Sequence, residues 1–288
     1  MEEIQKIWDK YDEDYVTRFL DTPDDLNTYA GTFYRDATEI LDAITRARNM
    51  ERNPKGFTID DAPILGLLVR TWKLLKEVIR YYEHNNAELI GLLERPVLES
   101  ATTATYLLRG DAELLDDYRK CSYKDRLRIL RDMEKGSPFF ETKAGKRLLA
   151  SVQDKLAFEN LTVEDFQVQR KNRWRIQGMS FYEIFGKIHH QSLYACTYGM
   201  MSDSIHGSWN ESMDYDLTKD QDGWFMPYPF YQPADIRFVT PLLHFCIPPY
   251  LLWLQRIDCE DEYLLSALNW IEKFNTVLFH RFDNLYDG

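Results

Sequence analysis

The chain has 288 residues, of which 44% are hydrophobic and 28% charged. These values exclude a collagenous, low-complexity or intrinsically disordered chain. The formal charge of -12 argues against a general nucleic-acid or anionic-membrane binder, because such proteins usually present a basic surface, but it leaves room for a local basic patch. With 13 Gly and 11 Pro the chain is poor in turn residues, which favours helix over an all-β fold.

The cysteines and the apolar segments indicate a cytoplasmic protein. No C-x-x-C pair occurs, so free thiols in a reducing compartment are expected at Cys121, Cys196, Cys246 and Cys259. The N-terminal residues are acidic and amphipathic, which is not typical of a signal peptide. The most apolar stretch, residues 241–257, is shorter than the roughly 20 residues that cross a bilayer. Because it holds the pair Pro248 and Pro249, it predicts a buried, Pro-broken helix and no membrane contact.

Helical periodicity runs through most of the chain. Taken in order, the expected helices cover residues 4–15, 22–49, 58–84, 87–109, 111–135, 143–159, 181–206, 235–256 and 261–281. Residues 207–234 are rich in Pro, Gly and Asp without periodicity, which predicts a long ordered loop or lid. No repeat and no long charged linker divides the chain. The sequence therefore predicts an all-α protein, a single large helical bundle with one domain over residues 1–288.

The segment 87–109 carries a narrow polar stripe on an otherwise apolar helix. Its members fall within about 40° of one line at 100° per residue: Glu88, Arg95, Glu99, Thr102 and Tyr106. One interpretation is an Arg95–Glu99 ion pair, four residues apart, on a strip of solvent. The other is an internal polar cleft. Pro96 favours the second, because it frees the carbonyl of Leu92 and makes the helix irregular beside Arg95.

A second polar set lies near residue 200. Tyr198, Ser202 and His206 are spaced at i, i+4 and i+8, along one face of the expected helix 181–206. His206 precedes Gly207, a residue typical of helix C-termini. A His there, one turn after a Ser, could accept and return a proton near neutral pH, as general acid–base catalysis requires. The alternative is a His that only caps its helix.

Together these two segments resemble a known family. The sequences LLERPVLESATTATYLL and YGMMSDSIHGS, with Arg95, Pro96 and Glu99 in the first and Ser202 and His206 in the second, resemble a prokaryotic helical family catalogued only as a domain of unknown function. The resemblance centres on residues 60–210. It implies a helical core on which the helices expected over 235–281 would pack.

More distantly, the chain looks like the HEPN helical proteins. Many of those are metal-independent ribonucleases of toxin and antiviral systems, and they carry an Arg shortly followed by a His. This chain departs from that pattern, because Ser202 and not an Arg stands one turn before His206. Catalysis of the HEPN kind would need an Arg from elsewhere, and Arg95 is the obvious candidate.

Metal and cofactor motifs are not seen. His189 and His190 are adjacent, so on a helix they point about 100° apart and cannot easily share a metal ion. No Glu-x-x-His pair, P-loop or G-x-G-x-x-G motif occurs. The compact basic patch with an aromatic inside it predicts either an exposed linker or contact with RNA phosphates and a stacked base. It consists of Arg170, Lys171, Arg173, Trp174 and Arg175.

Two functional classes therefore stand, with a small-molecule sensor as a third alternative. In the ribonuclease hypothesis His206 is the general acid or base and Arg95 balances phosphate charge. Glu99 orients Arg95, Ser202 and Tyr198 donate hydrogen bonds, and the basic patch guides RNA. In the other hypothesis the chain is a binding or scaffold protein with a protein partner, and these residues form a structural network. Because residues 224–231 are too apolar for a solvated loop, they are expected to pack on their own bundle or across a homodimer interface.

Overall fold

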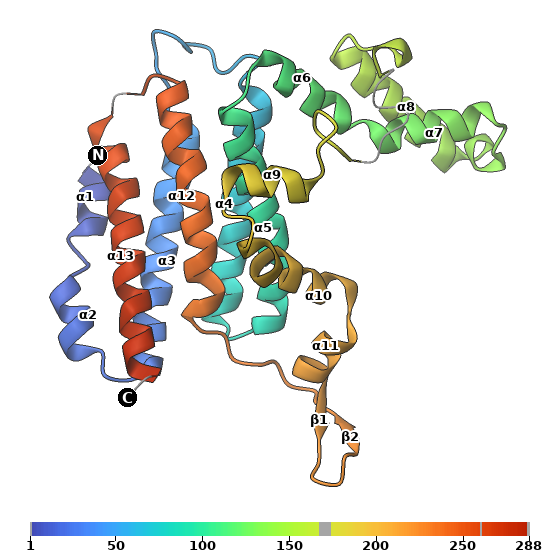
Figure 1. The fold of residues 1–288 in the computed structure, drawn as a ribbon. Coiled ribbons are helices and arrows are strands. Elements are labelled where there is room, and N and C mark those ends of the chain that lie inside the picture. The colour runs from blue at the N-terminus through green and yellow to red at the C-terminus, as the bar shows by residue number, and fades with distance from the viewer. Residues whose placement is uncertain (1, 167–173, 260, 287–288) are drawn as a thin grey trace. The chain divides into compact units, whose positions relative to one another are not determined.

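The structure, a computed structural model, describes residues 2–166, 174–259 and 261–286 (Figure 1). It is 73% helix, and within these ranges the strands form a two-stranded sheet only, so the predicted all-α class is confirmed. The chain divides into two compact units, Met1–Arg109 with Phe185–Gly288, and Gly110–Ile184. The expectation of one domain over residues 1–288 stays a prediction, which the number of melting transitions tests.

The first unit is built on long helices that lie side by side (Figure 1). The chain begins with two short helices, α1 (Glu2–Trp8) and α2 (Glu13–Phe19). The long helices of the bundle are α3 (Pro23–Arg46), α4 (Ala62–Glu83), α5 (Ala87–Leu108), α12 (Ile236–Arg256) and α13 (Glu262–Tyr286). Helix α5 packs against α4 and α12, and α13 packs against α12 and α3. The side chain of Asn86 starts α5 by accepting a hydrogen bond from the backbone N–H of Leu89.

Helix α12 is continuous, so the prediction of a Pro-broken helix over residues 241–257 is wrong. Pro241, Pro248 and Pro249 all lie inside it. A proline removes one backbone hydrogen bond and crowds the preceding turn, yet α12 is buried against α5, α13, α3 and α4, and this packing outweighs the local cost. No described helix is long and apolar enough to cross a membrane. The four cysteines are free thiols, as predicted.

The segment from residue 181 to 235 is more broken than predicted. Its elements are α9 (Phe181–Ile188), the π-helix η4 (Ala195–Gly199), α10 (Met200–His206), α11 (Trp209–Glu211), the π-helix η5 (Ser212–Asp216), β1 (Leu217–Lys219) and β2 (Phe225–Pro227). The single helix predicted over 181–206 is wrong, because His190 Nδ1 and the Ser192 hydroxyl bond to each other at 2.7 Å and compete with the helix there. Instead of one long loop, residues 207–234 include an antiparallel hairpin that pairs Thr218 with Met226.

The second unit is a small helical subdomain. Its elements are α6 (Ala112–Cys121), α7 (Lys124–Glu134), η1 (Pro138–Glu141), α8 (Lys143–Phe158) and η2 (Val163–Phe166). The one helix predicted over 111–135 is divided at Ser122 and Tyr123. The physical reason is the buried side chain of Tyr123, which joins the core of this unit beside Phe166 and donates a hydrogen bond to Glu159.

Candidate functional site

The candidate site lies where α10 approaches α5. Gly91 of α5 permits the approach, since a Cβ atom there would lie 2.9 Å from the hydroxyl oxygen of Ser204 on α10. The polar stripe of α5 therefore faces the segment that carries Tyr198, Ser202 and His206. Two polar sets about 100 residues apart in the sequence meet in the first unit.

Arg95 is the centre of this cluster. Its Nε donates to Glu99 Oε1 at 3.1 Å, and its Nη1 lies 3.4 Å from both Ser202 Oγ and His206 Nε2. The guanidinium also stacks over the ring of Tyr198, 4.5 Å from its centroid. The Arg95 side chain is 23% exposed. Arg95 is therefore held on several sides but is open to solvent in part.

Tyr198 and Glu99 form the inner side of the cluster. The hydroxyl of Tyr198, a buried residue in η4, donates to Glu99 Oε1 at 2.5 Å. Burial and the bond to Glu99 raise the pKa of Tyr198 above its ordinary value. Tyr198 therefore stays protonated near neutral pH and acts as a hydrogen-bond donor.

His206 forms the outer side. It is exposed and occupies the last turn of α10, which ends at Gly207 with a left-handed φ of 58°. Ser202, one turn earlier, donates its hydroxyl hydrogen to the carbonyl of Tyr198 at 2.8 Å. An N–H of Arg95 can donate to Nε2 of His206 only in the neutral imidazole, where that nitrogen carries a lone pair. The arrangement thus offers an accessible proton acceptor beside a fixed positive charge.

The rest of the polar stripe on α5 is covered. Glu88 accepts the backbone N–H of Gln232 at 3.0 Å, and the Thr102 hydroxyl lies 3.0 Å from His189 Nε2. Burial lowers the pKa of His189 to about 4, so this imidazole is neutral and structural at physiological pH. Lys187 lies 5.9 Å from the ring centroid of Tyr106. Within the described residues no group of three His, Cys, Asp or Glu side chains could hold a metal ion.

Sequence reasoning missed a carboxyl pair next to Arg95. Burial and the charge of Glu211 raise the pKa of Glu94 to about 7. Glu211 accepts a hydrogen bond from Ser204 at 3.0 Å, and burial raises its own pKa as well. The sequence does carry a signal for Glu94. This residue lies between Ile90 and Val97 on the apolar side of the helix, where burial of a carboxylate costs free energy.

Two residues of the predicted basic patch, Trp174 and Arg175, lie within the described part of the chain. Trp174 contacts the ring of Tyr118 edge to face at 6.2 Å, and Arg175 donates to the carbonyl of Gly178 at 2.8 Å. Arg175 also pairs with Glu183 at 3.7 Å. The remaining three predicted residues, Arg170, Lys171 and Arg173, lie outside the described residues.

Fold and contacts define an α-helical protein with an Arg–Glu–Tyr–Ser–His cluster where α10 meets α5. The chain belongs to DUF5677, a family of unknown function, whose model matches residues 61–223. That match covers more than half of the chain and includes the whole polar cluster, so the predicted membership of a family of unknown function is confirmed. No curated protein and no solved structure matches the chain.

Proposed function

We propose that this protein is a metal-independent ribonuclease of the HEPN kind, acting in the cytoplasm in a toxin or antiviral defence system. The observation that carries the proposal is the contact of His206 with Arg95. An exposed imidazole lies 3.4 Å from a partly exposed guanidinium that comes from a different helix. A general base for RNA must be open to solvent, and the imidazole of His206 is exposed.

The chemistry would be an internal transfer at phosphorus. Neutral His206 takes the proton from a ribose 2′-hydroxyl, and the resulting oxygen attacks the adjacent phosphorus. The bond to the 5′-oxygen breaks, that oxygen takes a proton from water, and a 2′,3′-cyclic phosphate remains. Arg95 stabilises the charge that develops on the phosphoryl oxygens, and Ser202 and Tyr198 donate hydrogen bonds in the site. Glu99 orients Arg95 throughout.

The test is cleavage of a single-stranded RNA labelled with a fluorophore and a quencher, in buffer containing EDTA. His206→Ala is expected to lower the cleavage rate by about 100-fold or more, and Arg95→Ala by about the same factor. His280→Ala is the matched control, since His280 is an exposed imidazole on α13. Intact RNA in the presence of the wild-type protein would contradict the proposal.

A second candidate is a binding or scaffold protein in which the same residues only stabilise the fold. The observation in its favour is that Glu99 and Tyr198 already engage Arg95, as charge partner and as stacked ring. In that case removal of His206 or Arg95 leaves a partner unsatisfied, at a cost of about 1 to 3 kcal/mol. The melting temperature would fall by about 2 to 4 °C per kcal/mol, with no RNA cleavage to lose.

We also propose a homodimer that covers the apolar segment 224–231. Its own bundle does not cover it, because Trp224 is 71% exposed, Phe230 68% and Tyr231 66%. A large exposed apolar patch usually marks an interaction site. Light scattering at tens of micromolar is expected to give twice the 34.3 kDa of the chain, and the monomer mass would contradict the dimer.

A further inference from the structure

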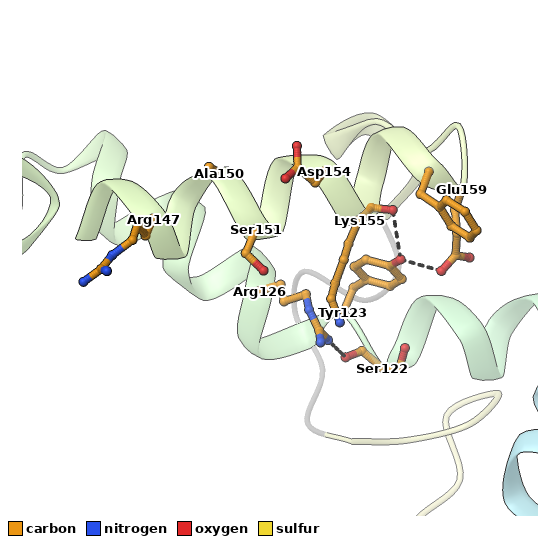
Figure 2. Close-up of a pocket in the computed structure, with 10 residues that line it drawn as sticks. Ser122, Tyr123, Arg126, Arg147, Ala150, Ser151, Asp154, Lys155 and Glu159 are labelled. Carbon is orange, nitrogen blue, oxygen red and sulfur yellow. Dashed lines mark hydrogen bonds between the residues drawn. The ribbon is translucent and has the colours of Figure 1, made fainter. Parts of the chain in front are cut away.

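The second unit contains a groove that the candidate site does not use. It lies between α8 and the residues that lead from α6 into α7, and its volume is about 680 Å³ (Figure 2). Three cationic side chains line it, Arg126 from α7 and Arg147 and Lys155 from α8, together with the hydroxyls of Ser122 and Ser151. Cations and hydroxyls in one groove are the groups that bind phosphate oxygens.

The three cations of this groove lack ion-pair partners in the part of the chain that the structure describes. Among the described residues, Arg126, Arg147 and Lys155 form no ion pair, whereas Arg119 and Lys120 on α6 both do. Arg126 is steadied by donating to the carbonyl of Ser122 at 3.2 Å and by lying 5.5 Å from the ring centroid of Tyr123. Their charge is therefore available to a ligand.

The two carboxylates at the groove do not cancel this charge. Glu159 is engaged by Arg119, whose Nη2 lies 2.7 Å from Oε2, and by the hydroxyl of Tyr123 at 2.5 Å. Asp154 points away from α7, while Ser151 and Lys155 extend toward it (Figure 2). The interior of the groove is therefore cationic.

An aromatic side chain completes the site. Phe158, the last residue of α8, lines the groove and is 85% exposed. Such exposure is unfavourable for a phenylalanine unless a partner covers the ring, because an apolar side chain gains on burial. A base stacked on an aromatic ring beside bound phosphates is the usual arrangement for single-stranded nucleic acids.

The formal charge of the chain is also distributed unevenly between the two units. Residues 110–184 hold 15 Lys and Arg against 13 Asp and Glu, a formal charge of +2, whereas the rest of the chain holds 20 against 34, a charge of -14. A polyanion that approaches the protein is therefore repelled by one unit and accepted by the other. The overall charge of -12 hides this local difference.

We propose that the groove between α7 and α8 binds a segment of single-stranded nucleic acid, with backbone phosphates on Arg126, Arg147 and Lys155 and a base stacked on Phe158. The site does not depend on the proposed function, since binding needs no cleavage.

Fluorescence anisotropy with a labelled 12-nucleotide RNA tests the proposal, using the full chain with His206→Ala so that the RNA stays intact. Three phosphate contacts predict that the logarithm of the binding constant falls with the logarithm of salt concentration with a slope of about -2. Replacing both Arg147 and Lys155 by Ala should reduce that slope by about 1.4. Phe158→Ala should weaken binding by about fivefold or more at any salt.

Two exposed residues of α8 outside the groove serve as matched controls, Lys146→Ala for charge and Leu148→Ala for apolar surface. Both should bind like the parent protein. DNA of the same sequence shows whether the ribose hydroxyl contributes. The proposal is overturned if no oligonucleotide binds, if the controls weaken binding as much as the groove variants, or if the protein binds only vesicles containing phosphatidylserine.

Discussion

The two units of this protein contain the same three-residue arrangement and use it differently. In the first unit the hydroxyl of Tyr198 donates to Glu99, which pairs with Arg95. In the second unit Tyr123 donates to Glu159, which pairs with Arg119, and both tyrosine hydroxyls lie 2.5 Å from their carboxylates. A tyrosine hydroxyl and an arginine on one carboxylate form a satisfied network that stabilises a helix–helix contact.

The two arginines differ in how many of their N–H groups remain for other partners. Arg119 donates two N–H groups to Glu159 and also pairs with Asp116, so its charge is neutralised inside the subdomain. Arg95 gives Nε to Glu99 and directs Nη1 toward Ser202 and His206. One arrangement of Tyr, Glu and Arg can therefore either close a structural contact or present a cation to a site.

The largest expected effect comes from separating α10 from α5. Gly91→Leu places a side chain where Ser204 already lies, which should cost about 3 kcal/mol of stability and abolish any activity of the cluster. Gly66→Leu is the matched variant on α4, since Gly66 is exposed and a Cβ there meets nothing within 4 Å. It should stabilise the chain by about 0.5 to 1 kcal/mol, because glycine is a poor helix former.

Urea unfolding of both variants provides the measurement. A Gly91→Leu protein as stable as the wild type would mean that α10 does not rest on α5 in solution. The cluster at Arg95 would then lose its geometric basis, while the groove of the second unit would be unaffected.

The next effect is a dependence of stability on pH that arises in the first unit. The folded protein raises the pKa of Glu94 from 4.5 to about 7, so the folded state holds this proton more tightly than the unfolded chain. The stability that the protonated Glu94 contributes is therefore lost as pH rises from about 4.5 through 7. The neighbouring charges in this region are acidic. Besides burial, Glu211 raises the pKa of Glu94, and Glu211, Asp214 and Glu88 raise the pKa of Tyr215, which Glu94 also affects.

Glu94→Gln should remove this slope. The variant is expected to exceed the wild type in stability by about 1 to 2 kcal/mol at pH 8 and to match it near pH 4.5. Chemical unfolding at a series of pH values measures the difference. Equal curves for the two proteins would show that Glu94 titrates like an exposed carboxyl and that neither burial nor the charge of Glu211 acts on it.

Much of the fold could be predicted from sequence because the signals are local. Asn86 and Gly110 bracket α5, and Gly207 ends α10, so these boundaries follow from capping chemistry. The breaks inside predicted helices depend on tertiary contacts. Tyr123 divides α6 from α7 only because its side chain reaches the core and Glu159, and α12 continues through its prolines only because other helices enclose it.

The candidate site was predictable where it follows helical spacing. Arg95 with Glu99, and Ser202 with His206, stand four residues apart, and each pair lies within one turn of a helix in the structure. The contact between the pairs could not be derived from spacing, because it depends on how α10 packs on α5. The groove has no such signal either, since Arg126 and Lys155 look like ordinary exposed charges until α7 and α8 are placed together.

The smallest effect tests the comparison itself, through loss of one hydroxyl from each unit. Tyr123→Phe should cost about 1.5 kcal/mol, because the Glu159 side chain is only 20% exposed and water replaces the lost bond poorly. Tyr198→Phe should cost about 1 kcal/mol or less, since the Glu99 side chain is 40% exposed. Burial and the bond to Glu159 raise the pKa of Tyr123 to about 12, so both hydroxyls are protonated donors at neutral pH.

Thermal melts measure the two costs, and RNA cleavage separates the roles, because only Tyr198→Phe should slow it. If Tyr123→Phe slowed cleavage equally while RNA binding was unchanged, the two arrangements would not differ in the way their arginines suggest.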